Sequence, residues 1–262
     1  MNPYDSDDQL KLIEFIDTQC GASAQIGLML VGSFARGDAK KFSDIDIILI
    51  SNEPSDLVQK ILRYEGRLLI INGVSEASIE EVFTNPLSAC RYLRGLRAAI
   101  PLTDPFGIIR HLKGRSLSFQ WDRTMKKKAA RYISSEMVGW LEEVHKGLDG
   151  LACKDTGRLL QSIHGCSWGL LRVMQIHLRV LEISDNTVVM DVSRTLGDAS
   201  EWSKLLKVAI GLDENDLPSR VRAGLHLYLL TADIVRPSLE PNEIGLLEPT
   251  LAHLREYLTN FN

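Results

Sequence analysis

Two short motifs constrain the fold of this chain more than any other part of the sequence. The apolar run Ile26–Val31 ends at Gly32-Ser33, and about ten residues later Asp44–Ile50 begins with acids that alternate with isoleucines. Short apolar runs that are bounded by turn residues are typical of buried strands. The pattern therefore predicts two strands that are joined by a polar loop, with a sharp turn after the first.

The turn itself suits an anion. Gly32 has no Cβ, so the backbone can turn sharply there or approach another group closely. Ser33 adds a hydroxyl and a backbone N–H, and a helix that begins near it would point its free N–H groups at an anion such as a triphosphate. Gly32 and Ser33 are therefore predicted to bind the nucleotide.

Asp44 and Asp46 are two residues apart on a predicted strand, so both carboxylates point to the same face. Two such carboxylates repel each other unless a cation lies between them, and Mg²⁺ prefers oxygen ligands. We predict that both acids are metal ligands and catalytic residues that align an α-phosphate for attack by a hydroxyl. The alternative is a turn and a strand with two solvated acids.

Together these motifs resemble the signature of the DNA polymerase β-type nucleotidyltransferase superfamily, in which apolar-Gly-Ser precedes Asp-x-Asp. The short motif and the helical tail are most similar to the aminoglycoside nucleotidyltransferases and related antibiotic-modifying enzymes. The specific part covers Ile26 to Ile50. The resemblance implies Mg²⁺ as cofactor and a nucleoside triphosphate, with ATP expected. It also implies transfer of a nucleoside monophosphate to a hydroxyl of a small molecule such as an aminoglycoside-like antibiotic.

The fold class expected from the whole chain is α+β. Strand patterns stop after about residue 115, so we expect a nucleotidyltransferase-type mixed sheet with flanking helices over residues 1–115 and an all-α helical bundle over residues 116–262. The local patterns predict helices at Asp7–Thr18, Pro54–Tyr64 and Leu159–Leu181, a strand at Arg67–Val74 and an extended segment at Ile108–Leu112.

Composition limits the partners and the location. No stretch of the sequence approaches the ~20 apolar residues that span a bilayer, and the acidic, polar N-terminus is not a secretory signal. We therefore expect a cytoplasmic protein with no membrane partner. The net charge of −4 argues against a broad nucleic-acid surface. A homodimer is compatible with the sequence.

One feature departs from the superfamily pattern. Many members carry a third carboxylate on a later strand, but the candidate strand Arg67–Val74 contains no acid and has Asn72 as its polar interior residue. Glu65 precedes this strand and Glu76 follows it. Three alternatives stay open: a two-carboxylate enzyme, a nucleotide-binding pseudo-enzyme, and an antitoxin-like or regulatory transferase that acts on a partner protein.

The resemblance also implies a general base in the helical domain. In some aminoglycoside nucleotidyltransferases this base is a glutamate four residues before a lysine, and Glu142 and Lys146 match that spacing. Residues four apart share a helix face, so Glu142 could deprotonate the acceptor while Lys146 contacts a phosphate. The alternative is an exposed ion pair of little energetic value.

Overall fold

The structure of the protein is a computed structural model that describes residues 5–20, 25–51 and 59–259. The chain divides into two compact units, Met1–Gln120 and Trp121–Asn262. Helix α5 (Ile108–Ser118) precedes the division, so the boundary predicted at residue 115 falls inside this helix.

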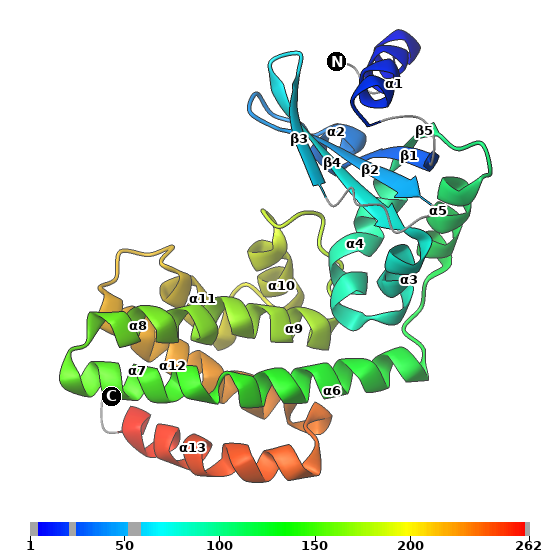
Figure 1. The fold of residues 1–262 in the computed structure, drawn as a ribbon. Helices are drawn as coiled ribbons and strands as arrows, with labels where there is room; N and C mark the ends of the chain where they lie inside the picture. Colours follow the sequence, from blue (N-terminus) through cyan, green and yellow to red (C-terminus); the bar gives the residue numbers. More distant parts are fainter. Residues whose placement is uncertain (1–4, 21–24, 52–58, 260–262) are drawn as a thin grey trace. The chain divides into compact units, whose positions relative to one another are not determined.

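A mixed sheet, five-stranded over the described residues, forms the centre of the N-terminal unit (Figure 1). Strand β2 (Ile45–Ser51) lies between β1 (Gln25–Val31) and β4 (Arg67–Ser75), while β3 (Gln59–Tyr64) and β5 (Ile100–Thr103) form the edges. β2 and β4 are parallel and the other neighbours are antiparallel. The predicted mixed sheet is confirmed.

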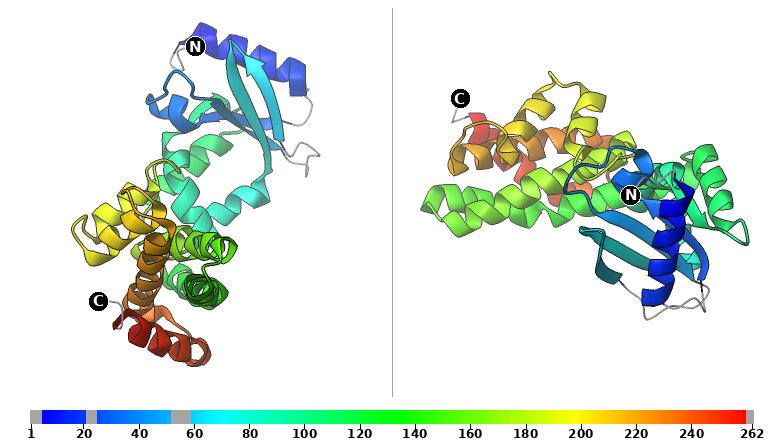
Figure 2. Two further views of the ribbon diagram at one scale, coloured as in Figure 1. Left: turned by 90° about the vertical axis from the view of Figure 1, so that its left-hand side faces the viewer. Right: turned by 90° about the horizontal axis from the view of Figure 1, so that it is seen from above.

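Helices flank both faces of this sheet. Helix α1 (Ser6–Cys20) lies along one face, as the left view of Figure 2 shows, and its Leu12 and Ile16 join the apolar side chains of β1, β2 and β4 in a fully buried core. On the other face, Ile109 of α5 contacts Gly27 so closely that a Cβ there would come within 3.1 Å of its Cδ1. Helices α3 (Glu76–Thr84) and α4 (Pro86–Ala98) pack against β4 and β1.

Two local predictions in this unit are wrong. Gln59–Tyr64 is strand β3 and not the end of a helix, and the rest of the predicted helix, residues 54–58, lies outside the described residues. The β3–β4 hairpin turns at Glu65-Gly66, which both have positive φ, as a two-residue hairpin requires. Ile108–Leu112 begins helix α5 and is not extended. Gly107 is its N-cap, and Asp104, four residues before the helix, accepts hydrogen bonds from the backbone N–H groups of Ile109 and Arg110 in the first turn.

The C-terminal unit is helical over its described residues. Its long helix α12 (Leu217–Val235) is largely buried, and Tyr228 on it donates a 2.5 Å hydrogen bond to Met137 O. The other elements are α6 (Arg123–Gly139), α7 (Leu141–Cys153), α8 (Thr156–Ile163), a π-helical segment (His164–Gly169), α9 (Leu170–Leu178), α10 (Val188–Leu196), α11 (Glu201–Ile210), a 3₁₀ turn (Arg236–Ser238) and α13 (Pro241–Thr259).

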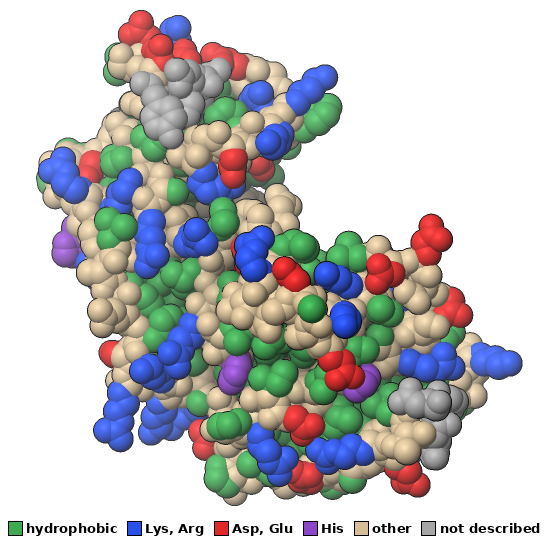
Figure 3. Space-filling model, turned by 180° about the vertical axis from the view of Figure 1, so that it is seen from behind, with side chains coloured by type: hydrophobic (Ala, Val, Ile, Leu, Met, Phe, Trp, Pro, Cys, Tyr) green, Lys and Arg blue, Asp and Glu red, His purple; other side chains and the backbone are tan. Residues whose placement is uncertain are grey.

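The helix predicted at Leu159–Leu181 is therefore not one regular α-helix. It widens into the π-helical segment where Gly165 and Gly169 pack on Trp140, and a Cβ at either glycine would approach the indole ring to 2.7 or 2.4 Å. One face of this unit carries acidic and basic side chains intermixed, as Figure 3 shows. No helix within residues 5–20, 25–51 and 59–259 is long and apolar enough to cross a bilayer. The cytoplasmic location and the homodimer stay predictions.

Candidate active site

The glycine-serine turn and the second aspartate meet in the structure. Val31, the last residue of β1, pairs with Asp46 of β2, and Gly32 then begins the short helix α2 (Gly32–Arg36). Gly32 has a φ of +69°, and a Cβ there would lie 2.2 Å from Asp46 Oδ2. Because both the positive φ and this close approach exclude a side chain, the site requires glycine at this position. Ser33 follows in the first turn of α2, where it is half-buried.

The two aspartates occupy the end of β2 that the sequence predicts. Asp44 directly precedes the strand and Asp46 is its second residue. Both are half-buried, and they alternate with the fully buried Ile45 and Ile47. Burial, together with the charge of Asp44, raises the pKa of Asp46 from 3.8 to about 6, while Arg36 opposes the rise. The protein therefore stabilises the negative charge of Asp46 less well than water does, despite the nearby Arg36.

Such a pair fits a divalent cation. A cation would relieve the repulsion between the carboxylates, and Mg²⁺ is commonly held by one or two carboxylates together with substrate phosphates. No cluster of three or more histidine, cysteine or acidic side chains with metal-binding geometry occurs in the described part of the chain. The acidic side chains that could hold a cation here are therefore Asp44 and Asp46, which stay predicted ligands, and phosphate oxygens would complete the coordination.

The register of β4 shows what occupies the place of a third acid. β4 runs parallel to β2, with Asp46 beside Ile70, so Leu68 and Ile70 lie on the aspartate face at the level of the two acids. Asn72 is one step further along, beside Ile48, and accepts a 3.0 Å hydrogen bond from Gln59. Glu65 lies in the hairpin turn, and Glu76 begins α3. The neighbouring strand therefore offers apolar side chains next to the acid pair.

Arg67 is a site residue that the sequence analysis missed. Its Nη1 donates to the carbonyl oxygens of Lys40, Lys41 and Ser43 at 2.9–3.1 Å, and its guanidinium lies over the Phe34 ring. These contacts fix the loop that leads directly into Asp44. The only signal in the sequence is a basic residue at the start of a strand, which is common on any surface.

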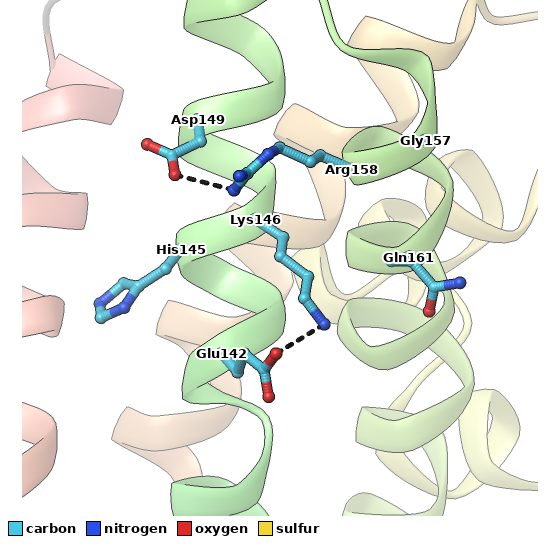
Figure 4. A pocket seen from close by; sticks show the side chains of 7 residues that line it. All are labelled: Glu142, His145, Lys146, Asp149, Gly157, Arg158 and Gln161. Atoms are coloured by element: carbon cyan, nitrogen blue, oxygen red, sulfur yellow. Dashed lines mark hydrogen bonds and ion pairs between the residues drawn. The ribbon is translucent and has the colours of Figure 1, made fainter.

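Glu142 and Lys146 lie in the other unit, on α7. They line an open groove of ≈ 460 Å³ between α7 and α8, together with His145, Asp149, Gly157, Arg158 and Gln161 (Figure 4). Lys146 Nζ contacts Glu142 Oε1 at 2.9 Å and Glu143 Oε1 at 2.8 Å. The hydrogen bond from Lys146 lowers the pKa of Glu142, which makes this carboxylate a weaker base, and the charge of Lys146 is already shared by two acids. The roles predicted for both residues stay predictions.

The chain is similar to known proteins in a segment of its sequence and in its fold. Residues 11–81 match the family model of the Nucleotidyltransferase domain, and this segment contains Gly32, Ser33, Asp44 and Asp46. The chain therefore contains a nucleotidyltransferase domain. Its presence makes the protein a transferase. The predicted relation to nucleotidyltransferases is confirmed at the level of this domain, and the relation to aminoglycoside nucleotidyltransferases stays a prediction.

A solved structure extends the likeness in fold to nearly the whole chain. It is a nucleotidyltransferase-like protein from Exiguobacterium sibiricum 255-15, 14% identical, with a TM-score of 0.53 over 97% of this chain and 91% of that one. The α+β fold with a helical C-terminal region is thereby confirmed. No match is found among the curated proteins.

Proposed function

We propose that this protein transfers a nucleoside monophosphate from a metal-bound nucleoside triphosphate, expected to be ATP, to a hydroxyl group of a small molecule. The observation that carries the proposal is that the Asp46 carboxylate fills the place of a side chain at Gly32, with Asp44 at the same end of β2. This arrangement brings the turn proposed to bind the triphosphate next to the carboxylates proposed to bind the cation.

Each residue of the site is proposed to bind the part of the metal–nucleotide complex that its chemistry suits. The backbone at Gly32 and Ser33 binds the triphosphate, and Asp44 and Asp46 hold the cation, expected to be Mg²⁺. When bound, the cation neutralises charge on the phosphates and on the leaving pyrophosphate. The acceptor oxygen bonds to the α-phosphorus while the bond to the bridging oxygen breaks, and the hydroxyl proton passes to a base.

We assign the base that accepts this proton to the helical unit. Leu68 and Ile70 supply no base beside the aspartates, and the resemblance implies Glu142 of the helical unit instead. Glu142 is a stronger base when Lys146 is drawn to a phosphate, because the hydrogen bond that lowers its pKa is then lost. Glu142→Gln tests this assignment, since a variant with full turnover would remove Glu142 from the mechanism.

The resemblance to antibiotic-modifying enzymes implies an aminoglycoside- or lincosamide-like acceptor. The test is pyrophosphate release from each of the four nucleoside triphosphates with Mg²⁺ and a panel of both compound classes. We expect release with at least one acceptor, and a loss of about a thousandfold in Asp44→Asn and Asp46→Asn. Equal rates in these variants and in the unchanged protein would refute the proposal.

A second candidate is a nucleotide-binding protein without turnover. Leu68 and Ile70 favour it, because they occupy the positions level with the acids where a third carboxylate would complete the pair. Metal-dependent binding of ATP that Asp46→Asn abolishes, without pyrophosphate release for any small acceptor, would support this candidate. Labelled AMP on a protein hydroxyl would instead indicate a regulatory transferase.

A further inference from the structure

An apolar surface adjoins the acid pair on the same face of the sheet. Ile61 of β3 is directly opposite Ile70 of β4, and Leu68 is two residues from Ile70 along the strand. Side chains of antiparallel partners share a face, as do residues two apart on a strand. We call these three side chains the β3–β4 shelf. Because Ile70 is the neighbour of Asp46, the shelf begins at the candidate metal site.

The shelf is largely exposed to solvent in the structure. Ile61 is 60% exposed and Leu68 is 44% exposed, although their neighbours in the strands, Leu62 and Leu69, pack into the core beneath α1. Arg63 is directly opposite Leu68 and shares this face, so it borders the shelf on the side of the hairpin turn, where its Nη1 reaches Gly66 O at 3.5 Å. The shelf is therefore an apolar surface that is continuous with two carboxylates.

From this arrangement, and resting on the proposed function, we infer that the β3–β4 shelf binds an apolar face of the acceptor. A molecule whose hydroxyl reaches the α-phosphate beside Asp46 has Ile70 as its next contact on the β4 side, followed by Ile61 and Leu68. Covering these side chains removes apolar surface from water, which favours an alkyl or aromatic group over a polycation. The acceptor is thus a hydroxylated compound with an apolar face, closer to a lincosamide than to an aminoglycoside.

Binding can be tested without turnover. In the full chain with ¹³C-labelled isoleucine and leucine methyl groups, we expect lincomycin to shift the signals of Ile61, Leu68 and Ile70, and kanamycin at the same concentration to leave them unchanged. The panel includes other hydroxylated compounds with and without an alkyl or aromatic face. Equal shifts with kanamycin, or no shift with any compound, would overturn the inference.

Kinetics provide the second test. In the double variant Ile61→Thr/Leu68→Ser, the acceptor KM should rise about tenfold, while kcat and the KM for the nucleotide stay within about twofold. Leu117→Ser is the matched control, because Leu117 is 65% exposed on α5 of the same unit. An increase in the nucleotide KM instead would assign the shelf to the nucleobase. Loss of a dimer in the double variant would assign it to a second copy of the chain. Either result would overturn the inference.

The two proposals fail in different ways. If no compound yields pyrophosphate, the proposed function fails, and the methyl signals still show whether apolar compounds bind the shelf. If turnover occurs with an unchanged acceptor KM in the double variant, the proposed function stands and the inference about the shelf fails.

Discussion

Two pairs of acidic side chains in this protein have opposite surroundings. Asp44 and Asp46 repel each other at the end of β2, and the pKa of Asp46 is raised to about 6. Glu142 and Glu143 on α7 instead share Lys146, with Nζ–O distances of 2.9 and 2.8 Å. A cation from outside would relieve the repulsion in the first pair, whereas the second pair already shares the positive charge of a lysine on its own helix. This difference is why we place the metal at the aspartates, and four predictions test it.

The largest effect is expected at Gly32. Gly32→Ala adds a Cβ 2.2 Å from Asp46 Oδ2 and strains a φ of +69°, so we expect a loss of about 3 kcal/mol in unfolding free energy and a loss of nucleotidyl transfer. Denaturant unfolding and pyrophosphate release measure the two effects. Gly66→Ala is the control, since Gly66 has a φ of +78° with nothing within 4 Å. It should lose about 1 kcal/mol to strain and keep its activity.

A smaller effect is expected for Arg67→Ala. The variant frees the loop before Asp44 from three hydrogen bonds, which should lower stability by about 2 kcal/mol and weaken Mn²⁺ or Mg²⁺ binding about tenfold. Calorimetric titration with the metal measures the affinity. Arg63→Ala removes an exposed arginine from the same hairpin and should change neither quantity. Unaltered metal affinity in Arg67→Ala would show that the loop positions Asp44 without the hydrogen bonds from Arg67.

Asp46→Asn should stabilise the metal-free protein while it abolishes transfer. The folded state holds the Asp46 proton more tightly than the unfolded state, so metal-free stability falls as pH rises from about 4 to about 6 and stays low above that. Because Asp46 is only partly buried, we expect Asp46→Asn to gain about 1 kcal/mol at pH 7 and nothing at pH 4. Thermal unfolding at the two pH values, with and without Mg²⁺, checks this. Equal stability of the two proteins at pH 7 would mean that the aspartate charge is already satisfied.

The smallest effect on stability is expected for Glu142→Gln. The Glu142 side chain is 75% exposed, whereas that of Glu143 is 14% exposed and keeps its bond to Lys146. The unfolding midpoint of Glu142→Gln should therefore not change measurably. Glu143→Gln is the comparison and should lower the midpoint, since Glu143 is the less exposed of the two acids that pair with Lys146. A clear loss of stability in Glu142→Gln would mean that the two glutamates share the lysine equally.

Local patterns predicted those parts of the fold that depend on neighbours in sequence. The strand–glycine–serine turn and the alternation of Asp44 and Asp46 with buried isoleucines follow from the two-residue period of a strand. Gln59–Tyr64 does not follow from the local pattern, because the residues of this edge strand do not alternate regularly between polar and apolar. Its extended conformation depends on pairing with β4. Helix α5 does not follow from the local pattern, because Gly107 is its N-cap and the acid that accepts its first N–H groups, Asp104, stands four residues before the helix.

The sequence by itself determined that a glycine, a serine and two aspartates stand at the ends of adjacent apolar runs, because spacing along the chain fixes the face to which a side chain points. Only the tertiary structure decided what surrounds them. Strand order and register bring Leu68 and Ile70 of β4 beside the acids and place Arg67 under the loop before Asp44. These contacts join residues far apart in the sequence, and they depend on how whole strands pair rather than on any local pattern.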